Sequence, residues 1–236
     1  MNYPGVINCE KDVMEKIKMA SRHEKIIDGH GPEISDKALN AYVLSGIRTE
    51  HECSSTSRSV RRSSIGMYIS LRQGSAAQNL EMLVKAIKPE NMRRCTLCTD
   101  DRHPTDLMNE GSIDNSIRIA IQSGINPISA IQMATINTAE CYGLKKIGAI
   151  APGYLADLVV VDNLEKFNIE KVFKAGKLIV EKNEVLFEIE QKDVSQPLNT
   201  VHIKNVEKKD LAIQMKTSQA NIIGLIDNNI ITKKVI

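Results

Sequence analysis

Over its first 142 residues, the chain alternates between short apolar runs and longer amphipathic segments. The short runs are rich in β-branched and aliphatic residues and are bounded by Gly, Pro or polar clusters, which predicts strands. The segments between them predict helices, among them 9–22, the polar stretch 54–64, 113–123 and 127–142. The predicted strands cover 25–30, 47–52, 65–72 and 94–100. Four strands separated by helices indicate an α/β fold with a parallel sheet.

The pattern changes at residue 143. Short strands and Gly/Pro turns replace the helical period, with DLVVVD at 157–162 and a hairpin at 172–180. After about residue 190 the sequence is only weakly patterned up to Ile236. We therefore expect three parts: an α/β part at 1–142, a small β unit at 143–190, and the start of a further domain, cut short, at 191–236.

Candidate metal ligands stand at the ends of three predicted strands. His30 and His51 are 51 − 30 = 21 residues apart, one strand–helix step, and Asp100 follows two steps later. A (β/α) barrel builds metal sites in this way, because the carboxyl ends of its parallel strands meet at one face. A lone His at a strand end is more often structural, but the repetition favours a site. The order His, His, Asp predicts a hydrolytic metalloenzyme.

Other polar residues near these strand ends are candidates with open alternatives. Glu52 can share a site with His51 only if the strand has ended, because side chains alternate along a strand, so a catalytic and a solvated Glu52 are both open. Arg72 could bind an anion or the substrate, or form a loop salt bridge. Asp101 and His103 lie in the loop after the last strand; Asp100 ranks above Asp101 as a ligand because it is nearer the strand.

Composition narrows the possible partners. Net charge is +2 with 25% charged residues, too balanced to predict nucleic acid or an acidic surface as partner, and we expect no membrane partner. The cluster Arg58, Arg61 and Arg62 is expected to be a solvent-facing helix surface. Aromatic residues make up 3% and Trp is absent, so the core should be aliphatic. No signal peptide or spanning segment is evident, and we expect a cytoplasmic enzyme.

The cysteines argue in the same direction. Five cysteines at scattered positions do not suggest a disulfide framework and fit a reducing compartment. Cys95 and Cys98 form a C-x-x-C pair, but the second Cys pair or helix N-terminus that a zinc or redox site needs is not evident. We expect these two residues to be small buried side chains on a strand.

Several long blocks resemble the adenine deaminases of bacteria and archaea in the amidohydrolase superfamily. They are MNYPGVI, IDGHGPEISDKALNAYVLSGIRTEHE, GMYISLRQGSAAQNL, CTDDRHPTDLMNEGSIDNSIR and INPISAIQMATINTAECYGL followed by GAIAPGYLADLVVVD. The resemblance is continuous to about residue 190 and weaker beyond it. TDDRHP and GSAAxNL are the most distinctive segments, and they do not point to dihydroorotase or imidazolonepropionase relatives.

The resemblance implies a TIM-type (β/α) barrel that hydrolyses adenine, a small molecule, to hypoxanthine and ammonia at a two-metal centre holding Mn²⁺ or Fe²⁺. His30 and His51 match the ligands of the fifth and sixth strands, and Asp100 matches the last-strand Asp that binds metal and moves the proton. The matched blocks also contain Glu52, which we expect to be catalytic. They contain three expected substrate contacts as well: Arg72, Asp101 and His103.

The family's first-strand His-x-His does not occur in this sequence. We therefore expect 1–142 to be about the last four βα units of a barrel, a fragment that lacks the N-terminal half. Such a chain could be inactive alone, and it could form a homo-oligomer or pair with a complementing N-terminal half. The alternative function is a non-catalytic remnant or a complementing half-subunit of an amidohydrolase.

Overall fold

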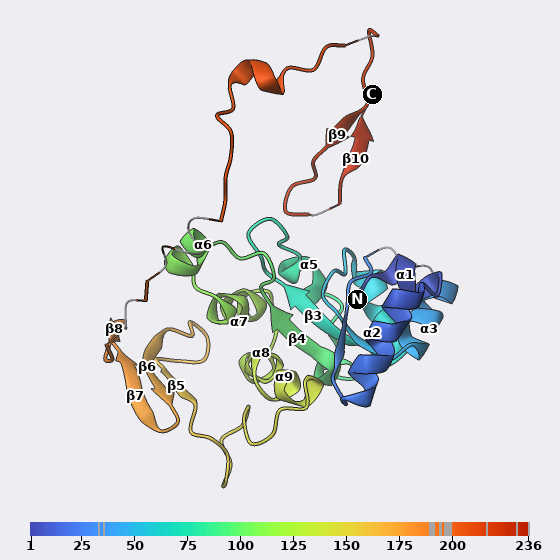
Figure 1. Cartoon of the computed structure of the whole chain (residues 1–236). Coiled ribbons are helices and arrows are strands. Elements are labelled where there is room, and N and C mark those ends of the chain that lie inside the picture. Colours follow the sequence, from blue (N-terminus) through green and yellow to red (C-terminus); the bar gives the residue numbers. More distant parts are fainter. Residues whose placement is uncertain are drawn as a thin grey trace.

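A computed structural model describes residues 1–32, 34, 36–188, 192–193, 195, 200–215, 217–229 and 231–235. Within these residues, four strands form a parallel sheet in the order β1-β2-β3-β4 (Figure 1). Their bounds are β1 Ile27–Gly29, β2 Ile47–Glu50, β3 Tyr68–Arg72 and β4 Cys95–Cys98. Each lies inside a predicted strand, so the α/β prediction is confirmed for this part of the chain.

Helices alternate with these strands and continue after them. Figure 1 shows α7, α8 and α9 beside β4, while α1, α2 and α3 gather at the opposite end of the sheet. The bounds are α1 Tyr3–Ile7, α2 Lys11–Arg22, α3 Asp36–Leu44, α4 Thr56–Ser64, α5 Leu80–Val84, η1 Met92–Arg94, α6 Pro104–Asn109, α7 Ile113–Gln122, α8 Pro127–Ala134 and α9 Ile136–Cys141.

One helix prediction was wrong in detail. The single helix expected over 127–142 is two helices, α8 and α9, separated at Thr135. Thr135 has φ −123° and ψ −92°, which is outside the helical region, and its side chain donates a hydrogen bond to the carbonyl of Ile131. Because a Thr hydroxyl can compete for backbone partners, this residue suits a break between two short helices.

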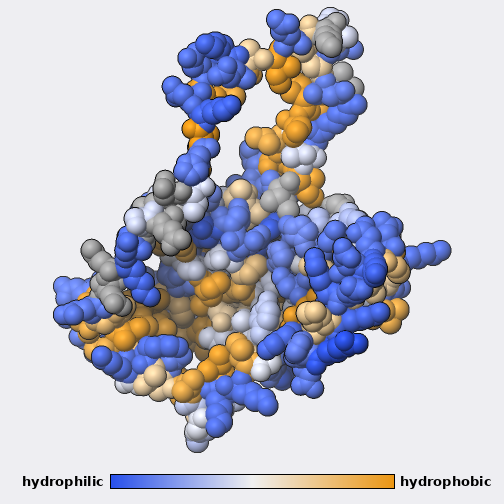
Figure 2. Space-filling model, viewed as in Figure 1, coloured by the Kyte–Doolittle hydropathy of each residue, from blue (hydrophilic) through white to orange (hydrophobic). Residues whose placement is uncertain are grey.

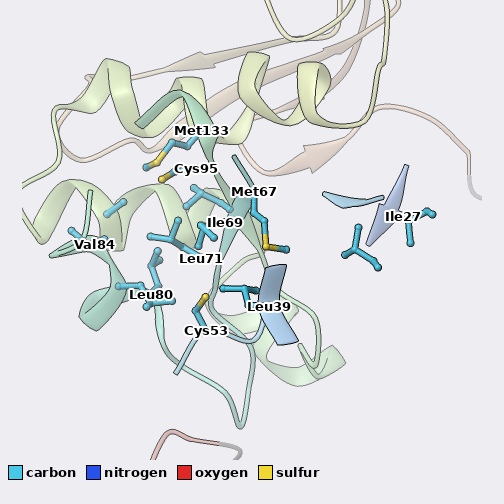
Figure 3. Packing of buried hydrophobic residues seen from close by; sticks show 14 of the residues in the cluster. Ile27, Leu39, Cys53, Met67, Ile69, Leu71, Leu80, Val84, Cys95 and Met133 are labelled. Carbon is cyan, nitrogen blue, oxygen red and sulfur yellow. The ribbon is translucent and has the colours of Figure 1, made fainter. Parts of the chain in front are cut away.

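One face of the parallel sheet forms the core. Ile69 and Leu71 of β3 and Cys95 of β4 pack with Leu80 and with Met133 of α8 (Figure 3). Ile69 is 0% and Leu71 1% exposed, and burial of such a side chain stabilises the fold by about 1.5–3 kcal/mol. The buried cluster is mainly aliphatic, as the composition predicts.

The other face of the sheet carries polar side chains. Ser70 of β3 and Thr96 of β4 share a buried hydrogen bond of 2.8 Å, and Thr49 of β2 donates to the carboxylate of Asp28 in β1. Ser70 and Thr96 alternate with the core residues of β3 and β4, since successive side chains of a strand point to opposite faces. Arg72 follows Ser70 on this polar face, at the carboxyl end of β3.

A second sheet follows the α/β layer. Within the described ranges its strands are antiparallel neighbours in chain order: β5 Leu158–Val161, β6 Ile169–Lys174, β7 Lys177–Glu181 and β8 Glu184–Val185. This confirms the small β unit. Figure 2 shows apolar side chains on its surface. Val159 of β5, for example, is 51% exposed.

The C-terminal part holds the short helix η2 Lys208–Leu211 and a hairpin of β9 Ile222–Gly224 and β10 Lys233–Val235. Figure 1 shows this hairpin apart from the two sheets, although Gln78 donates a backbone hydrogen bond of 3.1 Å to Asn228 in its loop. The division of the chain into domains at 1–142, 143–190 and 191–236 stays a prediction. No helix within the described part is long and apolar enough to span a membrane.

Two interpretations of single residues have definite outcomes. Cys95 and Cys98 lie on β4, burial raises the pKa of each thiol to about 12, and all five cysteines, which lie within the described part, are free. The interpretation as a buried strand residue is confirmed for Cys95, whereas Cys98 lies on the strand but is only partly buried. For Arg62, the expected solvent-facing position is wrong: the side chain is 1% exposed because Glu50 and backbone carbonyls surround it.

Candidate metal centre

The first candidate ligand, His30, directly follows β1. Its backbone forms a parallel bridge with Asn2, and its N–H donates 3.0 Å to the hydroxyl of Tyr42 from α3. Tyr42 in turn donates 2.6 Å to the carbonyl of Met1, and the terminal amine of Met1 donates 2.7 Å to the carbonyl of Asp28. These contacts tie the backbone around His30, while its side chain stays 59% exposed.

The second strand ends at Glu50, so the alternation of side chains does not separate His51 from Glu52. Nδ1 of His51 lies 3.1 Å from Oδ2 of Asp28. Oε2 of Glu52 lies 3.1 Å from Nδ1 of His30, and the Glu52 side chain is only 6% exposed. Glu52 therefore lies in the site, and the solvated alternative for this residue is wrong.

Ligand atoms of His30, His51 and Glu52 all lie within 4.8 Å of one another. The two imidazole rings have centroids 5.9 Å apart and are tilted by 53°. Two nitrogens and a carboxylate oxygen at this spacing suit a divalent metal such as zinc, iron or manganese. The structure thus brings together residues from the ends of two neighbouring strands.

Asp100 lies at the side of this group and reaches it through Arg72. Nη1 of Arg72 donates 2.6 Å to Oδ2 of Asp100 and 3.5 Å to Oε1 of Glu52. Arg72 is 1% exposed, and its Nε and Nη2 have no hydrogen-bond partner among the described residues. Asp100 has φ 56°, a left-handed conformation that Asp tolerates better than most residues. The two carboxylates are therefore held on one guanidinium, with Asp100 outside the group of three.

Asp28 is a site residue that sequence reasoning missed. Partial burial opposes ionisation of Asp28, but hydrogen bonds from His51 and Thr49 outweigh it and leave the pKa of this carboxyl below its ordinary value. The hydrogen bond to Asp28 raises the pKa of His51, against partial burial. A carboxylate on one imidazole nitrogen fixes the ring and leaves the other nitrogen for a metal. The signal was present: Asp28 stands two residues before His30, on the same side of β1.

Asp101 makes contacts away from this group. Its Oδ2 accepts hydrogen bonds from the backbone N–H of Ala76 at 2.8 Å and of Ala77 at 3.3 Å, while Oδ1 is buried without a hydrogen-bond partner among the described residues. A Cβ on Gly74 would lie 1.5 Å from Oδ1, so a glycine is needed at this contact. Asp101 therefore joins the loops after β3 and β4, and its substrate role stays a prediction.

His103 is exposed and precedes α6. Its backbone N–H donates 2.8 Å to the hydroxyl of Ser75, which donates to Asp106. These hydrogen bonds also tie the loop after β4 to the loop after β3. The structure does not place His103 among the three clustered side chains, and its role toward a substrate stays a prediction as well.

The buried carboxylate of Glu52 indicates that a metal ion would fit beside it. Oε2 of Glu52 has no hydrogen-bond partner among the described residues, and the nearest group from a candidate ligand is Nδ1 of His30 at 3.1 Å. An unpaired buried carboxylate oxygen is costly, and a cation would offset this cost. The donor set and this oxygen both fit a divalent metal bound by His30, His51 and Glu52.

Curated relatives align with this chain over almost its whole length. An adenine deaminase of Clostridium acetobutylicum is 45% identical over 236 residues, which is 100% of this chain and 41% of the relative. An adenine deaminase of Kosmotoga olearia is 44% identical over 99% of this chain and 41% of its own length. The chain thus spans about two fifths of the length of the curated relatives that it matches.

Solved structures show the same fold at low sequence identity. An enamidase, described as a new member of the amidohydrolase superfamily, has a TM-score of 0.60 at 20% identity. The matched region covers 73% of this chain and 52% of the enamidase chain. A β-aspartyl dipeptidase of Fervidobacterium islandicum AW-1 has a TM-score of 0.59 at 16% identity, over 81% of this chain and 56% of its own. Residues 1–179 match the profile described as "Amidohydrolase family". With this match over most of its length, the chain belongs to the amidohydrolase family.

Proposed function

We propose that this chain contributes a divalent metal centre to the hydrolytic deamination of adenine, which converts adenine and water to hypoxanthine and ammonia. The observation that carries the proposal is the group of His30, His51 and Glu52, whose ligand atoms lie within 4.8 Å. The adenine substrate is inferred from relatives named adenine deaminase at 39–45% identity. The four parallel strands are then part of a TIM-type barrel.

In this proposal His30, His51 and Glu52 hold the metal, with Asp100 as a further ligand from β4. A divalent metal supplies a water of lowered pKa, which hydrolysis at a purine carbon requires. Mn²⁺ and Fe²⁺ are the metals that we propose. Asp28 orients the imidazole of His51 through the 3.1 Å contact at Nδ1.

In this proposal two carboxylates serve proton transfer. Asp100 accepts a proton from the attacking water and returns it to the leaving amine, and Glu52 lies on the same guanidinium, that of Arg72. Arg72 holds both carboxylates in fixed directions, which limits the reorganisation that the reaction needs. Asp101 and His103, in the loop after β4, are the proposed substrate contacts from that loop.

The experiment is to follow hypoxanthine and ammonia formation from adenine by the purified chain with Mn²⁺ or Fe²⁺. A parallel arm adds the remaining part of the Clostridium acetobutylicum relative as a separate polypeptide, which tests a complementing half. Asp100→Asn should lower kcat by about 10²–10⁴-fold, the usual contribution of a general acid–base group. Asp12→Asn, on the exposed surface of α2, is the matched control and should leave kcat unchanged.

Two results would overturn the proposal. The first is turnover of dihydroorotate or imidazolonepropionate in place of adenine. The second is the absence of hypoxanthine in both arms, together with Mn²⁺ affinity that is the same in the wild type and in His51→Ala. The second result would favour the alternative of a non-catalytic remnant.

A further inference from the structure

A buried ion pair contacts the backbone next to the candidate metal ligands. Glu50 of β2 is 0% exposed and Arg62 of α4 is 1% exposed, and Nε of Arg62 lies 3.8 Å from Oε2 of Glu50. The attraction between two buried charges seldom offsets their desolvation, so additional hydrogen bonds are needed. Both Glu50 oxygens and Nη2 of Arg62 have such bonds, while Nε of Arg62 has no hydrogen-bond partner among the described residues. These hydrogen bonds connect the two side chains to the backbone around the candidate metal centre.

The Glu50 carboxylate accepts hydrogen bonds from two backbone amides. Oε2 accepts from the N–H of Gly31 at 3.0 Å, and Oε1 accepts from the N–H of Glu52 at 2.9 Å; both bonds are buried. Gly31 directly follows the candidate ligand His30, and Glu52 is itself a candidate ligand. One carboxylate therefore links the ends of β1 and β2 at the positions that supply the metal-binding side chains.

Arg62 holds the same turn from its other side. Its Nη2 donates to the carbonyl of Gly31 and, at 3.4 Å, to that of Pro32. A Cβ on Gly31 would lie 2.2 Å from Cδ1 of Ile34 and 3.4 Å from Oε2 of Glu50, so a larger residue at this position would have to displace the Ile34 side chain. Glu50 therefore binds the N–H of Gly31 and Arg62 binds its carbonyl, so that both backbone polar groups of Gly31 are held by this pair.

We propose that Glu50 and Arg62 are positioning residues for the metal centre, which set the separation of His30 from Glu52. The inference rests on the proposed function, because it concerns the same site. Metal ligands bind well only when supporting hydrogen bonds hold them in place. A pair that served stability alone could lie anywhere in the core, whereas this pair contacts the backbone at Gly31 and Glu52.

The test uses the full chain with Glu50→Gln and Arg62→Lys. Glu50→Gln replaces one accepting oxygen by an NH₂ group, which cannot accept from an amide N–H, and Arg62→Lys keeps the charge but loses the planar fork. Arg61→Lys is the matched control, because Arg61 lies on the same helix and pairs with Asp36 at the surface. The two readouts are the Mn²⁺ dissociation constant and amide hydrogen exchange of the metal-free protein.

Both buried-site variants should weaken Mn²⁺ binding by about 10–100-fold, as for other residues that support metal ligands. Exchange at the amides of Gly31 and Glu52 should accelerate relative to Ile69 in the core, while Arg61→Lys behaves as the wild type. Unchanged Mn²⁺ affinity in both variants, or acceleration equal at all three amides, would overturn the proposal. So would fast exchange at Gly31 and Glu52 in the wild type, a result that needs no variant to fold.

The two proposals fail in different ways. A wild type that binds no Mn²⁺, alone or with the added part of the relative, contradicts the proposed function. The exchange readout would still decide whether Glu50 and Arg62 position the ends of β1 and β2.

Discussion

Burial decides the chemistry of the cysteine side chains. Burial raises the pKa of Cys53, Cys95 and Cys98 to about 12 and that of Cys141 to about 11, while Cys9 is exposed. The thiolate is the reactive form, and a thiol with such a pKa holds almost none of it near neutral pH. The three buried cysteines and the partly buried Cys98 should therefore be inert in the folded protein.

We expect iodoacetamide at pH 8 to modify Cys9 rapidly in the native chain and the other four only after denaturation. Peptide mass spectrometry of native and urea-unfolded samples measures this directly. A Cys9→Ser variant is the control and should show almost no native labelling. Rapid native labelling at Cys95 would mean that β4 opens frequently, and would contradict its role as a core residue.

At the scale of single elements, the first turn of α7 is stabilised by a carboxylate. Oδ1 of Asp114 accepts 2.7 Å from the N–H of Ser112, and Oδ2 accepts 2.8 Å from Nη2 of Arg118, one turn later on the helix. Partial burial opposes ionisation, but these hydrogen bonds outweigh it and leave the pKa of Asp114 below its ordinary value. A negative charge at a helix N-terminus is also favoured by the helix dipole.

Asp114→Asn should reduce the free energy of unfolding at pH 7 by about 1 kcal/mol, since Asn can still accept from Ser112 but loses the charge. Because the folded pKa lies below the ordinary value of 3.8, the contribution is fully present above pH 3.8. It is lost as the pH falls below that value, through the folded pKa. Urea titrations at pH 7, 5 and 3 should thus show curves that converge at the lowest pH. A difference that persists unchanged at pH 3 would contradict the ionic explanation.

Elements were predictable where one signal dominated. Four strands and the long amphipathic helix α2 follow from apolar patterning alone, because each strand is a short apolar run between turns and α2 has one buried face. Helices α1 and α6, with 5 and 6 residues, were not predicted, since one turn of helix is too short to show a period. The break at Thr135 depends on local hydrogen bonding within 127–142, which a period of apolar residues does not contain.

The site shows the same division. His30, His51 and Glu52 were predictable as strand-end residues, whereas their partners depend on contacts between elements. Arg62 illustrates the difference: three arginines in a short stretch suggest a solvated face, yet one of them is buried against Glu50, from a strand that precedes the helix. A buried charge can be recognised only when its partner is known, and that partner is set by tertiary packing.

At the scale of the whole molecule, the parallel sheet and the C-terminal hairpin differ in how much surface they bury. The described residues from 200 onward are almost all exposed, including Ile213 at 90% and Leu225 at 81%. The hydrogen bond from Gln78 to the carbonyl of Asn228 joins this part to the loop after β3. Stability should therefore come from the apolar face shared by β3, β4 and their helices, because buried apolar area is the main favourable contribution to folding.

Deletion of residues 200–236 should leave the free energy of unfolding within about 0.5 kcal/mol of the full chain, as expected for changes away from buried groups. The slope of the urea transition should decrease only slightly, because it scales with the surface exposed on unfolding and this part buries little. Leu71→Ala, which opens a cavity beside the core, is the positive control and should cost about 2–5 kcal/mol. A large fall in the midpoint on deletion would instead show that the hairpin packs on the α/β layer, and its loop at Asn228 would then be a structural part of the region beside the candidate site.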